Sequence, residues 1–281
     1  MKFNRLTAML CLLGFCAGVA APAFADQLQD LKTRNELRCG IKTGVAPFAY
    51  IDPASSSLVG MDVDLCMAVA RTMGFPLQVV QLSVEERITE LKPAGRVDMV
   101  IANLAYTKSR AKLIDYSHAY YMTKEVLLVK KADAGRTLKS LEGQKMSAAK
   151  GSTSEQSIGL QRGVPVSFYD ANQALQALKK GEVVGFVSNM MSAINYVAES
   201  KGTADELAII SEPMVYEPIG IGLRKNEPAF ATEVNNALMK LEKSGEFLAI
   251  WNKWLGPNTQ YGITRTDKVA PISELKFDPM E

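Results

Sequence analysis

The sequence predicts an α/β protein built from two similar halves. Strand-like and helix-like patterns alternate between residues 37 and 104, which is typical of β-α-β units and of a mostly parallel sheet. The same alternation starts again near residue 125 and continues to residue 226. Two extended segments, near 122–130 and 214–224, are predicted to join the halves.

The first 25 residues have the features of a cleaved export signal. Lys2 and Arg5 form a basic segment, an apolar run follows, and Ala23-Phe24-Ala25 matches a small-residue cleavage site. The run is shorter than the about 20 apolar residues that a membrane-spanning helix needs, although a retained anchor is the alternative. We therefore expect residues 1–25 to be a signal peptide and the mature, soluble protein to begin near Asp26 in the periplasm.

In the first half, glycines mark the ends of the predicted elements. Gly40 ends a short strand that begins near Leu37, and Gly60 precedes a helix that Gly74 ends. The first turn of this helix carries two aspartates, which suit the positive end of a helix dipole. A strand, a helix and a strand are then predicted over residues 77–83, 83–95 and 96–104.

The second half repeats the pattern, and one long amphipathic helix is predicted over residues 229–256. A short helical turn is predicted at 137–143, and residues 144–157 read as a strand, a Gly/Ser/Thr turn and a helix. Residues 171–182 have the spacing of a helix. The predicted strands are 125–131, 165–170, 183–189, 206–213 and 219–226.

Composition and motifs argue against several functions. Without Lys2 and Arg5 the chain has 30 basic and 30 acidic residues, so it lacks the excess of basic charge typical of nucleic-acid partners. The single histidine, His118, lies in a tyrosine-rich stretch, and no zinc, phosphate-loop or dinucleotide motif is present. We predict no metal, no cofactor and no catalytic residue. Carboxylate chemistry remains open, because it needs only two acids with separated pKa values.

Two cysteines follow the predicted signal peptide, Cys39 and Cys66. In an oxidising compartment an even pair favours a disulfide. Two buried thiols are the alternative, because free cysteine packs as a small hydrophobic residue.

The order of elements also predicts where a ligand binds. In open α/β sheets, ligands lie beyond the carboxyl ends of the strands. In this chain those positions are residues 43–48, 102–110, 150–155 and 187–191.

Four stretches resemble periplasmic solute-binding proteins of polar amino-acid ABC importers, the family 3 type. They are GMDVDLCMAVARTM (60–73), TKSRAKLIDYSHAYY (107–121), LEGQKMSAAKGSTSE (141–155) and WNKWLG (251–256). The likeness is greatest to glutamate/aspartate- and glutamine-binding members, with Met61 as a mild departure. It extends over the whole mature chain.

The resemblance implies a two-lobe periplasmic-binding-protein fold of type II, in which each lobe has a mostly parallel sheet flanked by helices. Residues 26–124 with 220–281 would form lobe 1, and residues 125–219 lobe 2. A two-segment hinge would let the lobes close over a ligand. The family also implies a monomer that delivers its ligand to a membrane permease of an ABC transporter. A subset of the family has a disulfide like a Cys39–Cys66 bridge.

Two groups of residues resemble the family's carboxylate site. Arg110 stands where the family clamps the ligand's α-carboxylate, and its planar guanidinium suits bidentate binding. Backbone N–H groups of Gly151, Ser152 and Thr153 would add donors at a helix N-terminus. A solvated helix arginine and ordinary N-capping are the alternatives.

Several positions depart from the family. Asn189 stands where an aspartate usually meets the ligand's ammonium, which predicts weaker ammonium binding. Ala105 replaces a threonine whose hydroxyl often touches the ligand, and Asn103 replaces a small residue. Val45 and Glu85 replace aromatic residues of the hydrophobic cover.

Added positive charge accompanies these changes. Lys42 aligns with a position that is basic in glutamate/aspartate binders, and Lys150 lies beside the turn at Gly151. Either is alternatively a surface residue with a solvated amine. With Arg110 they predict a cleft of positive bias.

The leading hypothesis is a binder of an amino acid or a related small carboxylate for an ABC importer. A secreted lyase of the cyclohexadienyl or arogenate dehydratase type is the alternative, since such enzymes also resemble this scaffold. That reading needs an acid in the cleft, for which Glu85 is the candidate. A signalling or accessory binding protein is a third possibility.

Overall fold

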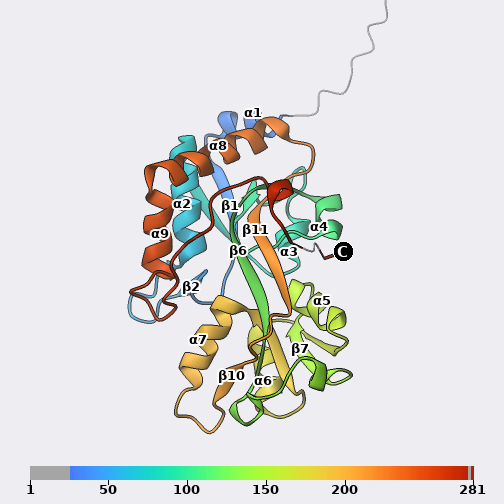
Figure 1. The fold of residues 1–281 in the computed structure, drawn as a ribbon. Helices are drawn as coiled ribbons and strands as arrows, with labels where there is room; N and C mark the ends of the chain where they lie inside the picture. Colours follow the sequence, from blue (N-terminus) through green and yellow to red (C-terminus); the bar gives the residue numbers. More distant parts are fainter. Residues whose placement is uncertain (1–25, 278–279) are drawn as a thin grey trace, which may run out of the picture.

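The computed structural model describes residues 26–277 and 280–281 and has two lobes, one above the other in Figure 1. The predicted signal peptide, residues 1–25, lies outside the described residues. Each lobe has part of a sheet with helices packed against it, as the α/β prediction required.

Lobe 1, the upper lobe, contains the N-terminal elements and the last two α-helices. Its helices are α1 (Gln27–Arg34), α2 (Met61–Met73), α3 (Glu86–Thr89), α4 (Lys108–Leu113), α8 (Pro228–Ser244) and α9 (Glu246–Trp254). Its strands are β1 (Leu37–Lys42), β2 (Tyr50–Ile51), β3 (Leu58–Val59), β4 (Leu77–Leu82) and β5 (Met99–Val100).

Lobe 2, the lower lobe, contains the middle of the chain. Its helices are α5 (Thr153–Leu160), α6 (Ala171–Lys179) and α7 (Met190–Ser200), with 3-10 turns η1 (Lys131–Asp133) and η2 (Lys139–Leu141). Its strands are β7 (Lys145–Ala149), β8 (Val164–Phe168), β9 (Gly185–Asn189) and β10 (Leu207–Ile209). A further 3-10 turn, η3 (Ile272–Glu274), belongs to the C-terminal segment.

Two long strands join the lobes, β6 (Asp115–Lys130) and β11 (Val215–Leu223). They pair with each other antiparallel, and the strand order across the sheet is β4-β1-β5-β11-β6-β9-β7-β8. The outer strands of each lobe are parallel: β4 and β5 beside β1, and β8 and β9 beside β7. The carboxyl ends of β1 and β9 therefore meet near the junction of the lobes.

Helix α2 illustrates how the sequence positions the site. Its buried face includes Leu65, Cys66 and Val69, which recur at helical spacing. Gly60 precedes it with a φ of 141° and approaches the backbone of Phe48 so closely that a Cβ would lie 2.0 Å from the carbonyl oxygen. A glycine is required there, and it lets the start of α2 pack against the loop that follows β1, where the N–H groups of Met61 and Asp62 donate to the carbonyls of Pro47 and Phe48.

The predicted C-terminal helix over residues 229–256 is wrong in one respect, because it is two helices. Gly245 ends α8 in the left-handed region, with a φ of 77°, and α9 begins at the next residue. Glycine commonly ends helices in this conformation, since it has no Cβ to clash. The chain then returns to β6, where Ala270 pairs with Ala119.

Other elements differ in length from the prediction. The helix predicted at 83–95 is the four-residue α3, and the strand predicted at 96–104 is the two-residue β5. Strand β6 begins ten residues earlier than predicted, because the stretch rich in tyrosine at 115–121 is extended and buried against β11. Helices α1 and α7 were not predicted. In α7 the helical spacing follows directly on strand β9 without a turn residue.

The hydrophobic core is divided in the same way as the chain. Two clusters are drawn from residues 31–121 and 219–269, with Met191 added from α7. Two others are drawn from residues 126–214. The exact lobe boundaries at 125 and 219 stay predictions.

The predicted disulfide is confirmed. Cys39 on β1 and Cys66 on α2 are bonded and fully buried, so the bridge ties the strand that ends at the site to the neighbouring helix. Within residues 26–277 and 280–281, no helix is both long and apolar enough to cross a membrane. The same residues contain no group of three or more potential metal ligands of the His, Cys, Asp or Glu type.

Candidate ligand-binding site

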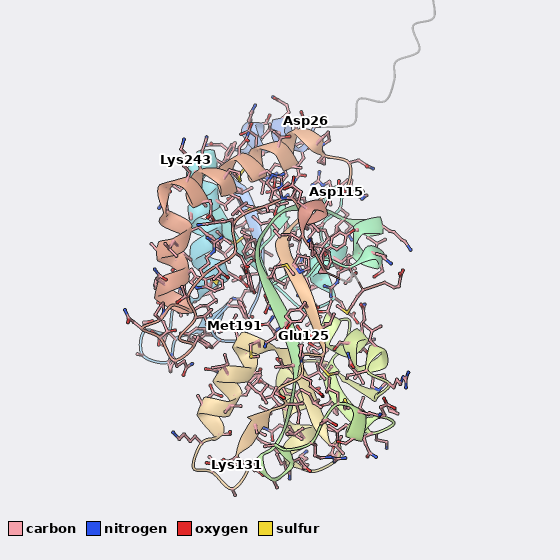
Figure 2. All side chains as sticks on the ribbon, viewed as in Figure 1. Asp26, Asp115, Glu125, Lys131, Met191 and Lys243 are labelled. Atoms are coloured by element: carbon pink, nitrogen blue, oxygen red, sulfur yellow. A yellow bond between two sulfur atoms is a disulfide. The ribbon has the colours of Figure 1, made fainter. Side chains whose placement is uncertain are left out.

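A small cavity lies between the lobes, next to the strands that join them; Glu125 on β6 marks its position in Figure 2. It encloses about 70 Å³. A cavity needs roughly 10–15 Å³ to admit one water, so this one has room for more than one water-sized group. The polar side chains around it are Lys42, Asp62, Arg87, Asn103, Glu125, Ser152, Thr153, Ser154, Ser188, Asn189 and Ser192.

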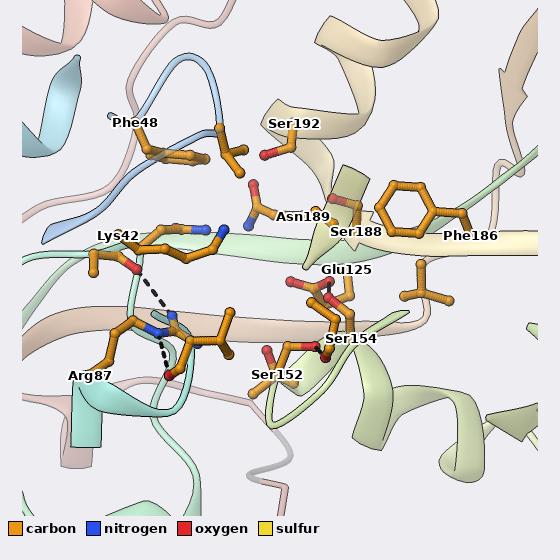
Figure 3. A pocket seen from close by; sticks show the side chains of 18 of the residues that line it. Lys42, Phe48, Arg87, Glu125, Ser152, Ser154, Phe186, Ser188, Asn189 and Ser192 are labelled. Atoms are coloured by element: carbon orange, nitrogen blue, oxygen red, sulfur yellow. Dashed lines mark hydrogen bonds between the residues drawn. The ribbon is translucent and has the colours of Figure 1, made fainter. Parts of the chain in front are cut away.

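Two cations lie on one side of this cavity, Lys42 at the end of β1 and Arg87 in α3 (Figure 3). The guanidinium of Arg87 donates to the carbonyls of Val84 and Ala102, each at 3.1 Å. Burial lowers the pKa of Lys42 to about 8 and that of Arg87 to about 9, and the repulsion of Arg87 and of Arg110, respectively, adds to this. Arg87 stays charged at neutral pH, and Lys42 is largely charged.

Asp62 lies near these cations, in the first turn of α2. Its carboxylate accepts a hydrogen bond from the backbone N–H of Asn103. Burial raises the pKa of Asp62 to about 7, although Lys42 and Arg87 lower it. Its Oδ2 has no hydrogen-bond partner among the described residues. The sequence accounted for Asp62 by the helix dipole, and the structure adds that it lines the cavity.

A buried pair of carboxyl groups lies on the strands that join the lobes, Glu125 on β6 and Glu217 on β11. Glu125 lines the cavity, accepts a hydrogen bond from the hydroxyl of Ser154 and is also hydrogen-bonded to Glu217. Burial raises the pKa of Glu125 above its usual range. Burial and the adjacent Glu125 raise the pKa of Glu217 well above its usual range. The two carboxyl groups share a buried site, so each opposes the ionisation of the other.

Arg110, the predicted carboxylate clamp, does not line the cavity in this structure. Thr107 caps its helix and accepts from the Arg110 backbone N–H at 3.1 Å. The guanidinium donates to the carbonyl of Ala105 at 2.9 Å and to that of Gly151 at 3.1 Å. Since Gly151 belongs to lobe 2, Arg110 links the two lobes. Its role as a clamp stays a prediction.

The predicted donors at the start of α5 are partly used within lobe 2. The N–H of Gly151 donates to Glu155 at 2.7 Å, and that of Ser152 donates to the Ala149 carbonyl at 3.2 Å. The Ser152 hydroxyl caps α5. Ser152 and Thr153 line the cavity, whereas Gly151 does not.

Asn189 lines the cavity at the end of β9, but its amide is committed to neighbouring groups. Its Oδ1 accepts from the backbone N–H of Met191 at 3.0 Å and so caps α7. Its Nδ2 donates to the hydroxyl of Thr123 at 2.9 Å.

Of the two predicted site residues that follow β5, Asn103 and Ala105, only one lines the cavity. Asn103 lines the cavity, has a φ of 45° and accepts a hydrogen bond from the hydroxyl of Tyr121. Ala105 does not line the cavity. It is buried, and its carbonyl accepts from Tyr116 at 2.9 Å as well as from Arg110.

Glu85 lies outside the cavity, at the rim between the lobes. Its carboxylate is 3.5 Å from the amine of Lys150, and the two side chains are 61% and 68% exposed. The acid on which the dehydratase alternative depended is therefore not placed in the cavity. Val45, in contrast, does line it.

Sequence reasoning missed three charged residues of the cavity, Asp62, Arg87 and Glu125. Arg87 follows two glutamates and reads as part of a solvated helix, and Glu125 reads as the first residue of a strand. The sequence held one signal for Glu125. The four residues that follow it, 126–129, are all apolar, which indicates that this end of the strand is buried.

Known proteins similar to this chain are solute-binding proteins. The family model for bacterial extracellular solute-binding proteins, family 3, matches residues 37–257. A glutamine-binding protein of an ABC transporter from Bacillus subtilis (strain 168) is 30% identical over 239 residues, which is 82% of this chain and 85% of that protein. An L-cystine-binding protein from Escherichia coli (strain K12) is 27% identical over 85% of this chain and 91% of that protein.

A solved structure is also similar: an ancestral arginine-binding protein bound to arginine, at 31% identity and a TM-score of 0.72. The match covers 79% of this chain and 99% of that one. These relatives are binding proteins and not enzymes, as predicted for this chain. From the family match over most of its length, the chain belongs to the bacterial extracellular solute-binding proteins, family 3.

Proposed function

We propose that this chain is the periplasmic substrate-binding component of an ABC importer, and that the interlobe cavity captures one amino acid or a related small carboxylate. The observation that carries the proposal is the arrangement of charge around the cavity. Cations from lobe 1 lie on one side, and the carboxylate of Glu125 lies across from them. Such a site suits a small molecule with charge of both signs.

The carboxylate of the ligand would bind on the cationic side. Lys42 and Arg87 already line that side, and a fixed guanidinium binds a carboxylate strongly once closure excludes water. Arg110 would join them by exchanging its bond to the Gly151 carbonyl for one to the ligand. The N-terminus of α5, at Thr153, adds a favourable dipole.

The remaining parts of the proposal rest on the family. Residues 1–25 would direct export, and lobes of residues 26–124 with 220–281 and of 125–219 would close by bending of β6 and β11. The closed, monomeric form would deliver its ligand to a membrane permease. The dehydratase alternative has less support, because the relatives are binding proteins and Glu85 lies outside the cavity.

A thermal-shift screen of the mature protein tests the proposal, with the twenty L-amino acids and a panel of small carboxylic acids as probes. A ligand held at 100 times its dissociation constant adds about 2.7 kcal/mol of stability, which raises the melting temperature measurably. No shift with any carboxylate would contradict the proposed function.

The carboxylate-binding arginine is identified by two matched variants, Arg87→Met and Arg110→Met. We expect loss of the clamping arginine to weaken the ligand found in the screen by about 30-fold or more, since truncating one partner of a buried charge pair typically costs 2–5 kcal/mol. Circular dichroism checks that each variant folds. Unchanged affinity in both folded variants would refute an arginine clamp.

A further inference from the structure

We infer that Glu125 supplies the negative charge that pairs with the ligand's ammonium group, and that the ligand is therefore an α-amino acid. The amide of Asn189 cannot supply this charge. The inference deepens the proposed function and rests on it. It changes the expectation from sequence, in which Asn189 alone predicted weak binding of an ammonium.

The geometry places Glu125 beside the position that the family uses. Strands β6 and β9 pair antiparallel with Glu125 directly opposite Asn189. Residues opposite each other in such a pair project from the same face of the sheet with Cβ atoms roughly 5 Å apart. Both side chains line the cavity. A carboxylate at 125 therefore reaches the same region as an acid at 189.

Glu125 is a buried carboxylate that faces this cavity without a cation of its own. Its side chain is on a residue only 3% exposed, and within the part of the chain that the structure describes no ammonium or guanidinium lies within 4.0 Å of it. Its hydrogen bonds are to the hydroxyl of Ser154 and the carboxyl group of Glu217. A buried charge is costly unless it is paired, and a bound ammonium would complete the pair.

Other groups at the cavity are less suited to this role. The amide of Asn189 carries no charge and is used to cap α7 and to hold Thr123. Asp62 lies on the cationic side, where Lys42 and Arg87 already act on it. Figure 3 shows Lys42 and Arg87 on one side and Glu125 on the other. An α-amino acid would thus place its carboxylate toward the cations and its ammonium toward Glu125.

The charged and titratable groups that face Glu125 come from every neighbouring element. They are Glu217 on β11, Arg110 on α4, Arg87 on α3, Lys42 on β1, and Tyr121 on β6 itself. Burial outweighs the arginines and holds the pKa of Glu125 above its usual value. A bound ammonium would lower this pKa, so affinity is full above the pKa of the free protein and falls as the pH drops through it.

The test compares each L-amino acid that binds in the screen with the same molecule lacking the amine, for example L-glutamine with 4-carbamoylbutanoate. Isothermal titration calorimetry on the mature wild-type chain should show that loss of the amine weakens binding by about 100-fold. Glu125→Gln should weaken the amino acid by a similar factor and leave the amine-free acid within about threefold. The affinity of this variant for the amino acid should also no longer decrease as the pH falls through the pKa of Glu125. Glu85→Gln, an exposed acid at the rim, is the matched control and should bind like wild type.

The outcomes separate this inference from the proposed function. No binding by any amino acid or carboxylic acid would refute the proposed function itself. Equal binding of both molecules by the wild-type protein would overturn the role of Glu125 while leaving a carboxylate binder intact. Equal binding would overturn the inference even if Glu125→Gln does not fold, and in a folded Glu125→Gln an unchanged preference for the amine would overturn it as well.

Discussion

Charged residues lie where the two lobes meet both inside the cavity and at its rim, but the two groups differ in burial and therefore in the strength of their electrostatic interactions. At the rim, Glu85 and Lys150 form an ion pair between the lobes at 3.5 Å, and both are mostly exposed. In the cavity, Asp62 is buried and Lys42 is half-buried, and burial moves their pKa values to about 7 and about 8, respectively. Water screens the first pair, whereas the second interacts through a medium of lower dielectric constant.

The largest effect should come from Asp62. Because its pKa in the folded state is raised from 3.8 to about 7, the folded protein holds the proton that the unfolded chain releases. The contribution of this group to stability is therefore greatest below about pH 4 and is lost as the pH rises to about 7. Asp62→Asn should remove this contribution, so in urea-unfolding measurements the variant should gain stability relative to wild type as the pH rises from 4 to 7, and at pH 7.5 it should be more stable by on the order of 4 kcal/mol.

Asp64→Asn is the matched control for that measurement. Asp64 lies in the same first turn of α2 but bonds to Lys253 and Trp254 outside the cavity. This variant keeps Asp62 and should keep the wild-type slope between pH 4 and pH 7. A stability difference between Asp62→Asn and wild type that does not change between pH 4 and pH 7 would show that Asp62 is hydrated in the folded state.

The same contrast explains how far the sequence could predict the site. Patterns along the chain predicted the α/β class, the disulfide and the stretches that supply Val45, Thr153 and Asn189, whereas Lys42 was named from the family resemblance. They did not separate Glu85, which is exposed, from Glu125, which is buried. The burial of Glu125 depends on β11, about 90 residues further along the chain, whose Glu217 lies beside it. Local periodicity carries no information on such a pairing.

Helix α3 gives a second example. Residues 83–95 have the composition of a longer helix, yet only four residues are helical, and Arg87 turns inward to the carbonyls of Val84 and Ala102. Lone arginines on helices are usually exposed, so the sequence favoured a solvated side chain. In the folded protein two backbone carbonyls hold the guanidinium in the cavity wall, so tertiary packing overrides the local preference.

A smaller effect is expected for the coupling between Lys42 and Asp62. The double-mutant cycle of Lys42→Met and Asp62→Asn should give an interaction of about 1–2 kcal/mol at pH 7.5, because the charges share a buried site without forming a direct ion pair. Chemical unfolding of the four proteins measures it. A coupling near zero would mean that water in the cavity screens the two charges as effectively as at the rim.

The smallest effect should come from the rim. The cycle of Glu85→Gln and Lys150→Met should give a coupling below about 0.5 kcal/mol, since two exposed side chains at 3.5 Å lose conformational entropy in pairing and are screened by salt. It should disappear in 1 M NaCl, where the screening length is about 3 Å, while the cavity coupling persists. Ligand affinity in both single variants should stay within about twofold of wild type. A rim coupling as large as that of Lys42 with Asp62 would show that closure of the lobes, and not burial within the cavity, sets the strength of charges at this junction.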